Sequence, residues 1–295
     1  MGVVNWWHHE LGKRIAIIIE NKEITLNGKC KIIWRNNVIA RLKKGNNYLN
    51  PEIEILADDA LDDLSKSKLE FFLKNWVDNH IKEILEDLLN LNKESVDNKY
   101  IRALMFQLFE NNGVIKRELV EGIVKSIKTE ERKKIWDLGI KIGRYHIYLP
   151  KMLKPKAVSL RISLWRLFYQ LAANQEVPKS GLNYLNDKKY NKNFLLLCGF
   201  EKFKNHYVRI DILEKLFIKI LNKTKNRKFK INAEMINLIG CNKEGFYSLM
   251  LSMNYKKSKE VDTYFYTGES KRKDKYINVN KNENPFKKLL ALNLK

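Results

Sequence analysis

Seven basic side chains in the middle of the chain are well suited to bind a polyanion. They are Lys141, Arg144, Lys151, Lys154, Lys156, Arg161 and Arg166. The stretch that holds them, residues 138–175, contains no Asp and no Glu. Because Lys and Arg neutralise phosphate groups, cations without neighbouring acids predict contact with nucleic acid. The alternative interpretation is a solvated loop and helix face of a lysine-rich protein.

Aromatic residues are interleaved with these cations. Tyr145, Tyr148 and Trp165 permit base stacking, although each is equally suited to a protein core. His146 lies between Tyr145 and Ile147, and we interpret it as a packed strand histidine rather than as a nucleic-acid contact.

A strand, a turn and a helix are expected to position the seven cations. Residues alternate in character between Gly139 and Leu149, which predicts a short strand that ends at Pro150. Pro155 suits the first turn of a helix, and the apolar residues after it recur at helical spacing. Such an arrangement would turn the basic side chains toward phosphate.

The composition indicates a globular protein of two or three domains with a polyanionic partner. The chain has 295 residues, of which 44% are hydrophobic and 31% are charged, and its net charge is +22. Nucleic acid is the commonest polyanionic partner, and we expect RNA rather than DNA because of the resemblance described below, not because of the charge. An anionic membrane is the rival, but no uncharged run approaches the roughly 18 apolar residues of a membrane span.

Patterns of catalysis and metal binding are mostly missing. The glycines of the segment 240–245 lack the Lys and hydroxyl residue that complete a phosphate-binding loop, and no acidic helicase box is present. His8, His9 and Glu10 lack the second histidine of a zinc protease. The acidic segment 58–63 is better interpreted as a solvated helix start than as a cation site. We therefore predict no catalytic residue, cofactor or metal in this chain.

The cysteines and the N-terminus indicate a cytoplasmic protein. Cys30, Cys198 and Cys241 are too widely spaced for a disulfide framework or a zinc knuckle. No signal peptide is visible at the N-terminus.

We expect an α+β fold that is mainly α-helical and has four parts. Residues 1–57 form a small β-containing subdomain, and residues 58–175 form a helical domain with the basic strand, turn and helix. Residues 176–266 form a winged-helix-like subdomain, with an unclassified α+β subdomain as the alternative. Residues 267–295 form a basic C-terminal tail.

Local signals place the elements of the first two parts. Residues 4–21 are expected to be helical, with a strand as the alternative. Asn27-Gly28 predicts a hairpin turn in a sheet of three or four strands. Ser67 and Glu70 form a capping box that opens a long helix. Three further helices are predicted at 101–109, 119–127 and 129–139, and the tight turn between the first two resembles a helix-turn-helix corner.

Local signals after a boundary at 174–190 predict the third part. A short helix ends at Gly199, and a hairpin surrounds residues 204–206. Asp211 and Glu214 form a second capping box that opens a helix, which is followed by a cationic loop at 222–230. Two helices and an apolar strand come next, which is the order of a winged helix.

The stretch 138–165 resembles the signature of a bacterial helicase family that is best represented in alphaproteobacteria. This family is similar to the mitochondrial DExH-box RNA helicase of the degradosome. Shorter stretches, such as residues 102–113, resemble other parts of the family. The residues that match the signature are Leu138, Gly139, Gly143, Tyr145, His146, Ile147, Leu149, Pro150, Leu153, Lys154, Pro155, Leu164 and Trp165.

The resemblance implies the accessory region that follows the two RecA-like motor domains of the family, which this chain lacks. It implies a nucleic-acid-binding chain that guides a strand for a motor supplied elsewhere, with ATP and magnesium needed only by that motor. Two alternatives stay open. One is a protein-interaction or assembly module of an RNA-processing or ribosome-associated complex, and the other is the C-terminal part of a complete ATP-dependent helicase.

Overall fold

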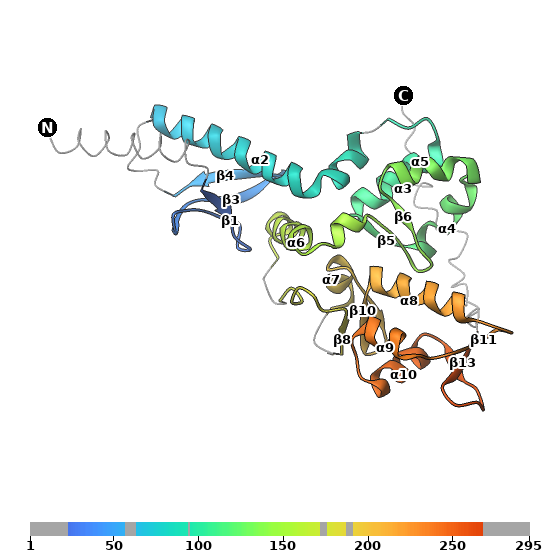
Figure 1. The fold of residues 1–295 in the computed structure, drawn as a ribbon. Helices are drawn as coiled ribbons and strands as arrows, with labels where there is room; N and C mark the ends of the chain where they lie inside the picture. The colour runs from blue at the N-terminus through green and yellow to red at the C-terminus, as the bar shows by residue number, and fades with distance from the viewer. Residues whose placement is uncertain (1–22, 57–62, 94, 172–175, 187–190, 268–295) are drawn as a thin grey trace, which may run out of the picture. The chain divides into compact units, whose positions relative to one another are not determined.

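A computed structural model describes residues 23–56, 63–93, 95–171, 176–186 and 191–267 (Figure 1). The fold is mixed α and β and mainly helical, which confirms the predicted fold class. Several expectations lie outside the described residues: the helix at 4–21, the histidines near the N-terminus, nearly all of the acidic segment 58–63, and the basic tail.

The chain divides into two compact units. One comprises residues 1–218 and 238–240, and the other comprises residues 219–237 and 241–295. The division falls inside helix α8 (Ile210–Lys223), so it does not coincide with the predicted boundary at 174–190. Among the described residues, no helix has both the length and the apolar character that a membrane span requires.

A four-stranded antiparallel sheet opens the described chain and confirms the predicted hairpins. Asn27 shapes the first hairpin, because its Oδ1 accepts hydrogen bonds from the backbone N–H groups of Lys29 (3.0 Å) and Lys31 (2.9 Å). The strands pair in sequence order. They are β1 (Ile24–Leu26), β2 (Lys31–Trp34), β3 (Asn37–Asn47) and β4 (Asn50–Ile55).

A long helix, α2 (Asp63–Lys93), packs against this sheet with one apolar stripe. The helix begins before Ser67, which therefore lies in its interior, so the predicted capping box is wrong. Leu85 departs from helical geometry (φ −112°, ψ 23°) and marks a kink. The buried stripe comprises Leu69, Leu73, Val77, Ile81, Leu85, Leu88 and Leu91.

The rest of the described chain repeats one order of elements three times: a helix, a strand, one or two helices, and a two-stranded hairpin. The first repeat comprises α3 (Lys99–Glu110), β5 (Val114–Lys116), α4 (Arg117–Ser126), the 3-10 turn η2 (Thr129–Glu131), α5 (Arg132–Asp137), β6 (Lys141–Ile142) and β7 (His146–Tyr148). The second follows the 3-10 turn η3 (Pro150–Leu153) and comprises α6 (Pro155–Tyr169), β8 (Tyr184–Leu185), α7 (Lys192–Leu197), β9 (Phe200–Phe203) and β10 (His206–Arg209). The third comprises α8, β11 (Lys228–Lys230), α9 (Ala233–Ile239), α10 (Lys243–Ser252), β12 (Tyr255–Lys257) and β13 (Thr263–Tyr266).

Each repeat joins its three strands into the same antiparallel sheet. The orders are β5-β7-β6, β8-β10-β9 and β11-β13-β12, so the first strand always pairs with the last. The repeats begin at Lys99, Pro155 and Ile210, which is about every 55 residues. In each repeat, a residue with positive φ ends the helix that precedes the hairpin. These residues are Gly139, Gly199 and Asn254.

This order of elements and strands is that of a winged helix. The third repeat has it over residues 210–266, whereas the winged-helix-like subdomain was predicted over 176–266, which also includes most of the second repeat. The first repeat has it as well, which the sequence analysis did not anticipate. The second repeat has one helix, α7, in the described residues between its first two strands.

Two predictions for the first repeat are wrong in detail. The residues between α3 and α4 form strand β5 rather than only a tight turn, so the two helices do not make a simple helix-turn-helix corner. The predicted single strand before Pro150 is a hairpin of β6 and β7, because the chain reverses at Gly143–Tyr145. Strand β7 pairs with β5 on its other side.

A buried carboxylate holds the turn of this hairpin. Glu214 does not close the predicted capping box of α8. It accepts hydrogen bonds from the backbone N–H groups of Arg144 (2.6 Å), Tyr145 (2.9 Å) and His146 (3.3 Å). A Cβ atom at Gly143 would overlap the Glu214 carboxylate, so any larger residue there would have to displace this carboxylate from the turn.

Replacing Glu214 with Ala should lower the free energy of unfolding by about 2–3 kcal/mol, because three N–H groups lose a charged acceptor. Urea unfolding followed by circular dichroism measures this change. Glu244→Ala, on the exposed side of α10, is the control and should change stability little. Equal stability of the two variants would contradict the role given to Glu214.

Candidate nucleic-acid interface

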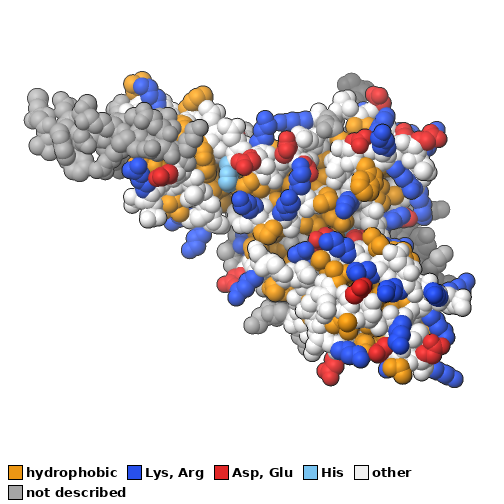
Figure 2. Space-filling model, viewed as in Figure 1, with side chains coloured by type: hydrophobic (Ala, Val, Ile, Leu, Met, Phe, Trp, Pro, Cys, Tyr) orange, Lys and Arg blue, Asp and Glu red, His pale blue; other side chains and the backbone are white. Residues whose placement is uncertain are grey.

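Lys and Arg side chains are spread widely over the visible face of the molecule (Figure 2). Charge alone therefore does not single out a binding site, and the surroundings of each cation must be compared. The structure brings three of the seven predicted cations together and places the other four elsewhere.

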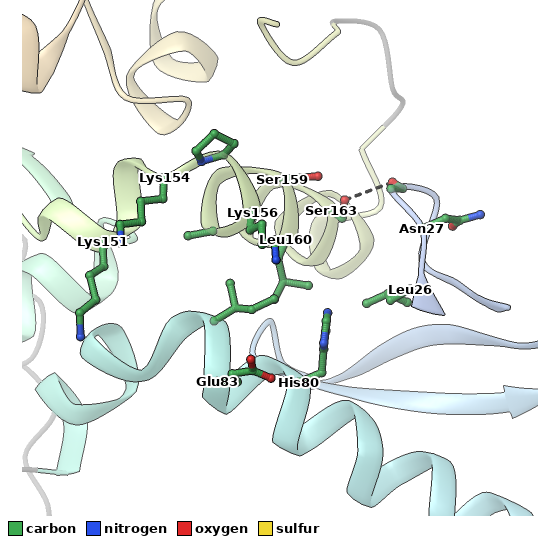
Figure 3. Close-up of a pocket in the computed structure, with 14 residues that line it drawn as sticks. Leu26, Asn27, His80, Glu83, Lys151, Lys154, Lys156, Ser159, Leu160 and Ser163 are labelled. Atoms are coloured by element: carbon green, nitrogen blue, oxygen red, sulfur yellow. Dashed lines mark hydrogen bonds between the residues drawn. The ribbon is translucent and has the colours of Figure 1, made fainter. Parts of the chain in front are cut away.

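Lys151, Lys154 and Lys156 line one cavity of about 630 Å³, which we call the lysine cavity (Figure 3). Its walls come from η3 and the start of α6, from α2, and from the turn between β1 and β2. All three lysines are exposed. The apolar part of the wall includes Leu26, Ile84, Ala157 and Leu160.

Two prolines shape the backbone that carries the three lysines. Pro150 begins η3, and Pro155 occupies the first position of α6, as the sequence predicted. Lys154 is the N-cap residue of α6, and its side chain makes no capping hydrogen bond. The helix therefore begins at the cavity wall with N–H groups that no side chain caps, and the positive end of the helix dipole adds to the lysine charges.

Lys151 differs from the other two lysines because it has a partner. Its Nζ lies 2.7 Å from Oδ1 of Asp87, a side chain that is only 13% exposed. The hydrogen bond and the charge of Asp87 raise the pKa of Lys151. Lys154 and Lys156 make no ion pair within the part of the chain that the structure describes, so their charges are available to a ligand.

His80 contributes an imidazole ring to the same cavity. Figure 3 shows its side chain extending from α2 toward α6. The ring stacks on Trp76, with centroids 5.0 Å apart and an interplanar angle of 11°. Burial lowers the pKa of His80; Glu83 acts to raise it, and Lys156 acts to lower it. The ring is therefore neutral at pH 7 and gains a positive charge only in acid.

None of the other four predicted cations lines the lysine cavity, and three of them lie at or near the surface. Lys141 and Arg144 are exposed on the hairpin of β6 and β7. The Arg144 guanidinium carbon lies 5.8 Å from the ring centroid of Phe217. Arg166 is half-buried, with its guanidinium carbon 5.0 Å from the ring centroid of Phe194.

The prediction that Arg161 contacts phosphate is wrong, because Arg161 is fully buried. Its Nη1 donates to the carbonyl oxygen of Asn112, and its Nη2 donates to those of Met152 (2.7 Å) and Leu197 (3.3 Å). Burial lowers the pKa of the guanidinium to about 10, so it stays charged at neutral pH. Arg161 therefore joins three backbone segments inside the protein.

The aromatic residues of the stretch are mostly packed. Tyr148 is buried, and Tyr145 packs edge-on against Phe203 and Phe217. His146 is buried and bonded to Glu201 (2.7 Å), which confirms that it is a packed strand histidine.

Sequence reasoning missed the contribution of α2 and of the first hairpin to the cavity. His80 and Glu83 lie one helical turn apart beside the buried stripe of α2, where they look like ordinary surface residues. Only the packing of α2 beside α6 brings them to the lysines, and no local pattern indicates that contact.

No protein-family model, no curated protein and no solved structure matches this chain.

Replacing Arg161 with Met should lower the free energy of unfolding by about 2–4 kcal/mol, because three buried carbonyl groups lose their donor while the volume is kept. Urea unfolding tests this. Arg144→Met, at an exposed position, should change stability by well under 1 kcal/mol. If Arg161→Met were as stable as the wild type, the internal role of this guanidinium would be refuted.

Binding of a phosphate-containing ligand at the lysine cavity should tighten as the pH falls below the pKa of His80, because the protonated imidazole adds a positive charge. The dissociation constant for a nucleic-acid strand, measured from pH 7.5 to 5.5, tests this. In His80→Gln the tightening should be smaller, since this side chain cannot be protonated. The same pH profile in both proteins would exclude His80 from the site.

Proposed function

We propose that the chain binds nucleic acid and acts as an accessory region that guides a strand, with ATP hydrolysis supplied by a separate motor. The observation that carries the proposal is the grouping of Lys151, Lys154 and Lys156 around a concave site at the start of α6. RNA is the favoured partner in this proposal, on the basis of the sequence resemblance.

The chemistry of the lysine cavity suits a nucleotide unit. Ammonium groups and the uncapped N–H groups of α6 are donors for phosphate oxygens. The apolar wall around Leu26 and Leu160 and the ring of His80 provide surfaces for a base. The cavity volume of about 630 Å³ lies within the range of sites for small organic ligands.

The arrangement supports binding without strong sequence preference. Lysines neutralise phosphate, which is the same at every position of a strand, so they carry no base information. The winged-helix order of the first and third repeats is compatible with this function, because such folds are common in nucleic-acid-binding proteins. A fold by itself does not establish a function, so the lysine cavity carries the proposal.

Replacing Lys151, Lys154 and Lys156 together with Ala should weaken binding to all strand sequences alike. The slope of log K against log salt should become shallower by about 2, as expected for three phosphate contacts on a single strand. Fluorescence anisotropy with labelled RNA and DNA strands, at several salt concentrations, measures both quantities.

A matched control removes three exposed lysines of α2 that do not line the cavity: Lys68, Lys82 and Lys93. This variant loses the same net charge but should keep most of the salt dependence. Equal losses in the two triple variants would attribute binding to net charge and reject the lysine cavity. A loss confined to one strand sequence would contradict a phosphate contact.

A further inference from the structure

The sheet of the third repeat contains β11, β13 and β12 (Figure 1). On one of its faces, exposed lysines flank the half-buried ring of Phe265. Phe229 and Tyr264 are cross-strand partners and are both buried, so they face the core. Side chains alternate along a strand, so the adjacent residues Lys228, Lys230 and Phe265 lie on the opposite face.

The strand register places Phe265 between two lysines. Phe265 pairs with Lys228 of β11 on one side and with Lys256 of β12 on the other. Directly opposed residues have Cβ atoms about 5 Å apart, so both ammonium groups can reach past the ring. Lys228 makes an ion pair with Glu260 (3.3 Å) that is mostly exposed and therefore weak. Lys256 is exposed and makes no ion pair within the described ranges.

The same positions of the first repeat have a different role. In the first repeat, the three residues that pair across the strands at these positions are Val114, Tyr148 and Lys141. Val114 and Tyr148 pack against Ile210. This face is thus covered by protein in the first repeat, and the apolar side chain of Val114 on β5 suits that packing. In the third repeat this position is Lys228, which cannot form such a contact without loss of hydration.

A tight turn extends the basic face of the third repeat. Lys225 and Lys228 exchange backbone hydrogen bonds of 2.8 and 2.9 Å around Asn226 (φ 49°) and Arg227 (φ 62°). Positive φ at both central residues defines a turn whose second central position favours glycine. Arg227 therefore occupies a position where glycine would stabilise the turn more.

We propose that this face binds a single strand of nucleic acid, with Phe265 stacked on an unpaired base and with Arg227, Lys228 and Lys256 on the flanking phosphates. Stacking on an aromatic ring tolerates any base, because every base has a π face. A duplex hides those faces, so a single strand is the ligand that fits an aromatic ring flanked by cations. This proposal takes only the class of ligand, nucleic acid, from the proposed function. The binding site itself is a different one, because the lysine cavity belongs to the other compact unit.

Two variants of the full chain and two strands test the stacking. Phe265→Leu keeps an apolar side chain but removes the ring, and it should weaken binding of a labelled oligothymidine or oligouridine about tenfold. A strand of the same length without bases should bind the variant and the wild type equally, because it keeps only the phosphates. Phe71→Ala, which removes an exposed aromatic side chain from α2, should leave binding of both strands unchanged. Equal weakening on the two strands, or equal weakening on a duplex, would overturn the proposal.

Arg227→Gly separates binding from folding. Glycine suits the positive φ, so the thermal midpoint should stay the same or rise, while strand binding weakens and the salt slope becomes shallower by about 0.7. Binding equal to that of the wild type would refute the contact of Arg227 with phosphate.

The two proposals fail in different ways. If the wild-type chain binds no strand at low salt, the proposed function itself fails. If the chain binds and only the triple lysine variant of the first unit is weakened, the lysine cavity stands and the sheet face is rejected.

Discussion

The buried guanidinium of Arg161 is a central interaction among those that join the first two repeats. It donates to carbonyl groups before β5, in η3 and at the end of α7, so that one side chain satisfies backbone acceptors from three segments. A buried charge is costly unless acceptors replace water around it, and here three carbonyl groups do so at Nη1 and Nη2, while Nε has no hydrogen-bond partner within the described residues. Arg161 lies on α6, so this contact helps to hold the helix in place together with its buried apolar residues, such as Leu160 and Ile162. Because the lysine cavity lies at the first turn of α6, the placement of its lysines depends on a cation that no ligand can reach.

A second internal network shows how charge is used inside the first unit. Glu201 of the second repeat is bonded to Lys116 (2.6 Å) and His146 (2.7 Å) of the first. Burial acts to raise the pKa of Glu201, but the hydrogen bonds and charges of His146 and Lys116 lower it below its usual value. The carboxylate is therefore ionised and paired, and it links the outward faces of two neighbouring sheets. Basic residues in the described part of the chain thus include some that are bonded inside the fold, such as Lys116 and Arg161, and others that are exposed, such as Lys154 and Lys156.

Local patterns predicted the elements well and their contacts poorly. Asn27-Gly28 marks a turn and Pro155 a helix start through backbone chemistry that acts over a few residues, and both were placed correctly. The capping boxes at Ser67 and Asp211 failed because both motifs lie in helices that had already begun. Arg161 could not be told from Lys154 or Lys156 in the sequence, since its burial depends on carbonyl groups far along the chain. The alternating pattern of residues 139–149 concealed a reversal at Gly143 that only the carboxylate of Glu214 explains.

The three repeats share one scaffold and differ in what covers its outward sheet face. In the first, Val114 and Tyr148 meet apolar neighbours, and Lys116 and His146 meet Glu201. In the second repeat, Glu201 on β9 accepts the hydrogen bonds from Lys116 and His146 of the first. The outward sheet face of the second repeat is therefore also in contact with protein within the unit. The third repeat has Lys228 and Lys256 at the positions that flank the central aromatic residue, and these side chains are most stable in water or beside an anion. The face that the first two repeats use for contact within the unit is therefore the face on which the third repeat carries exposed lysines, and this difference is why we propose it as a binding surface.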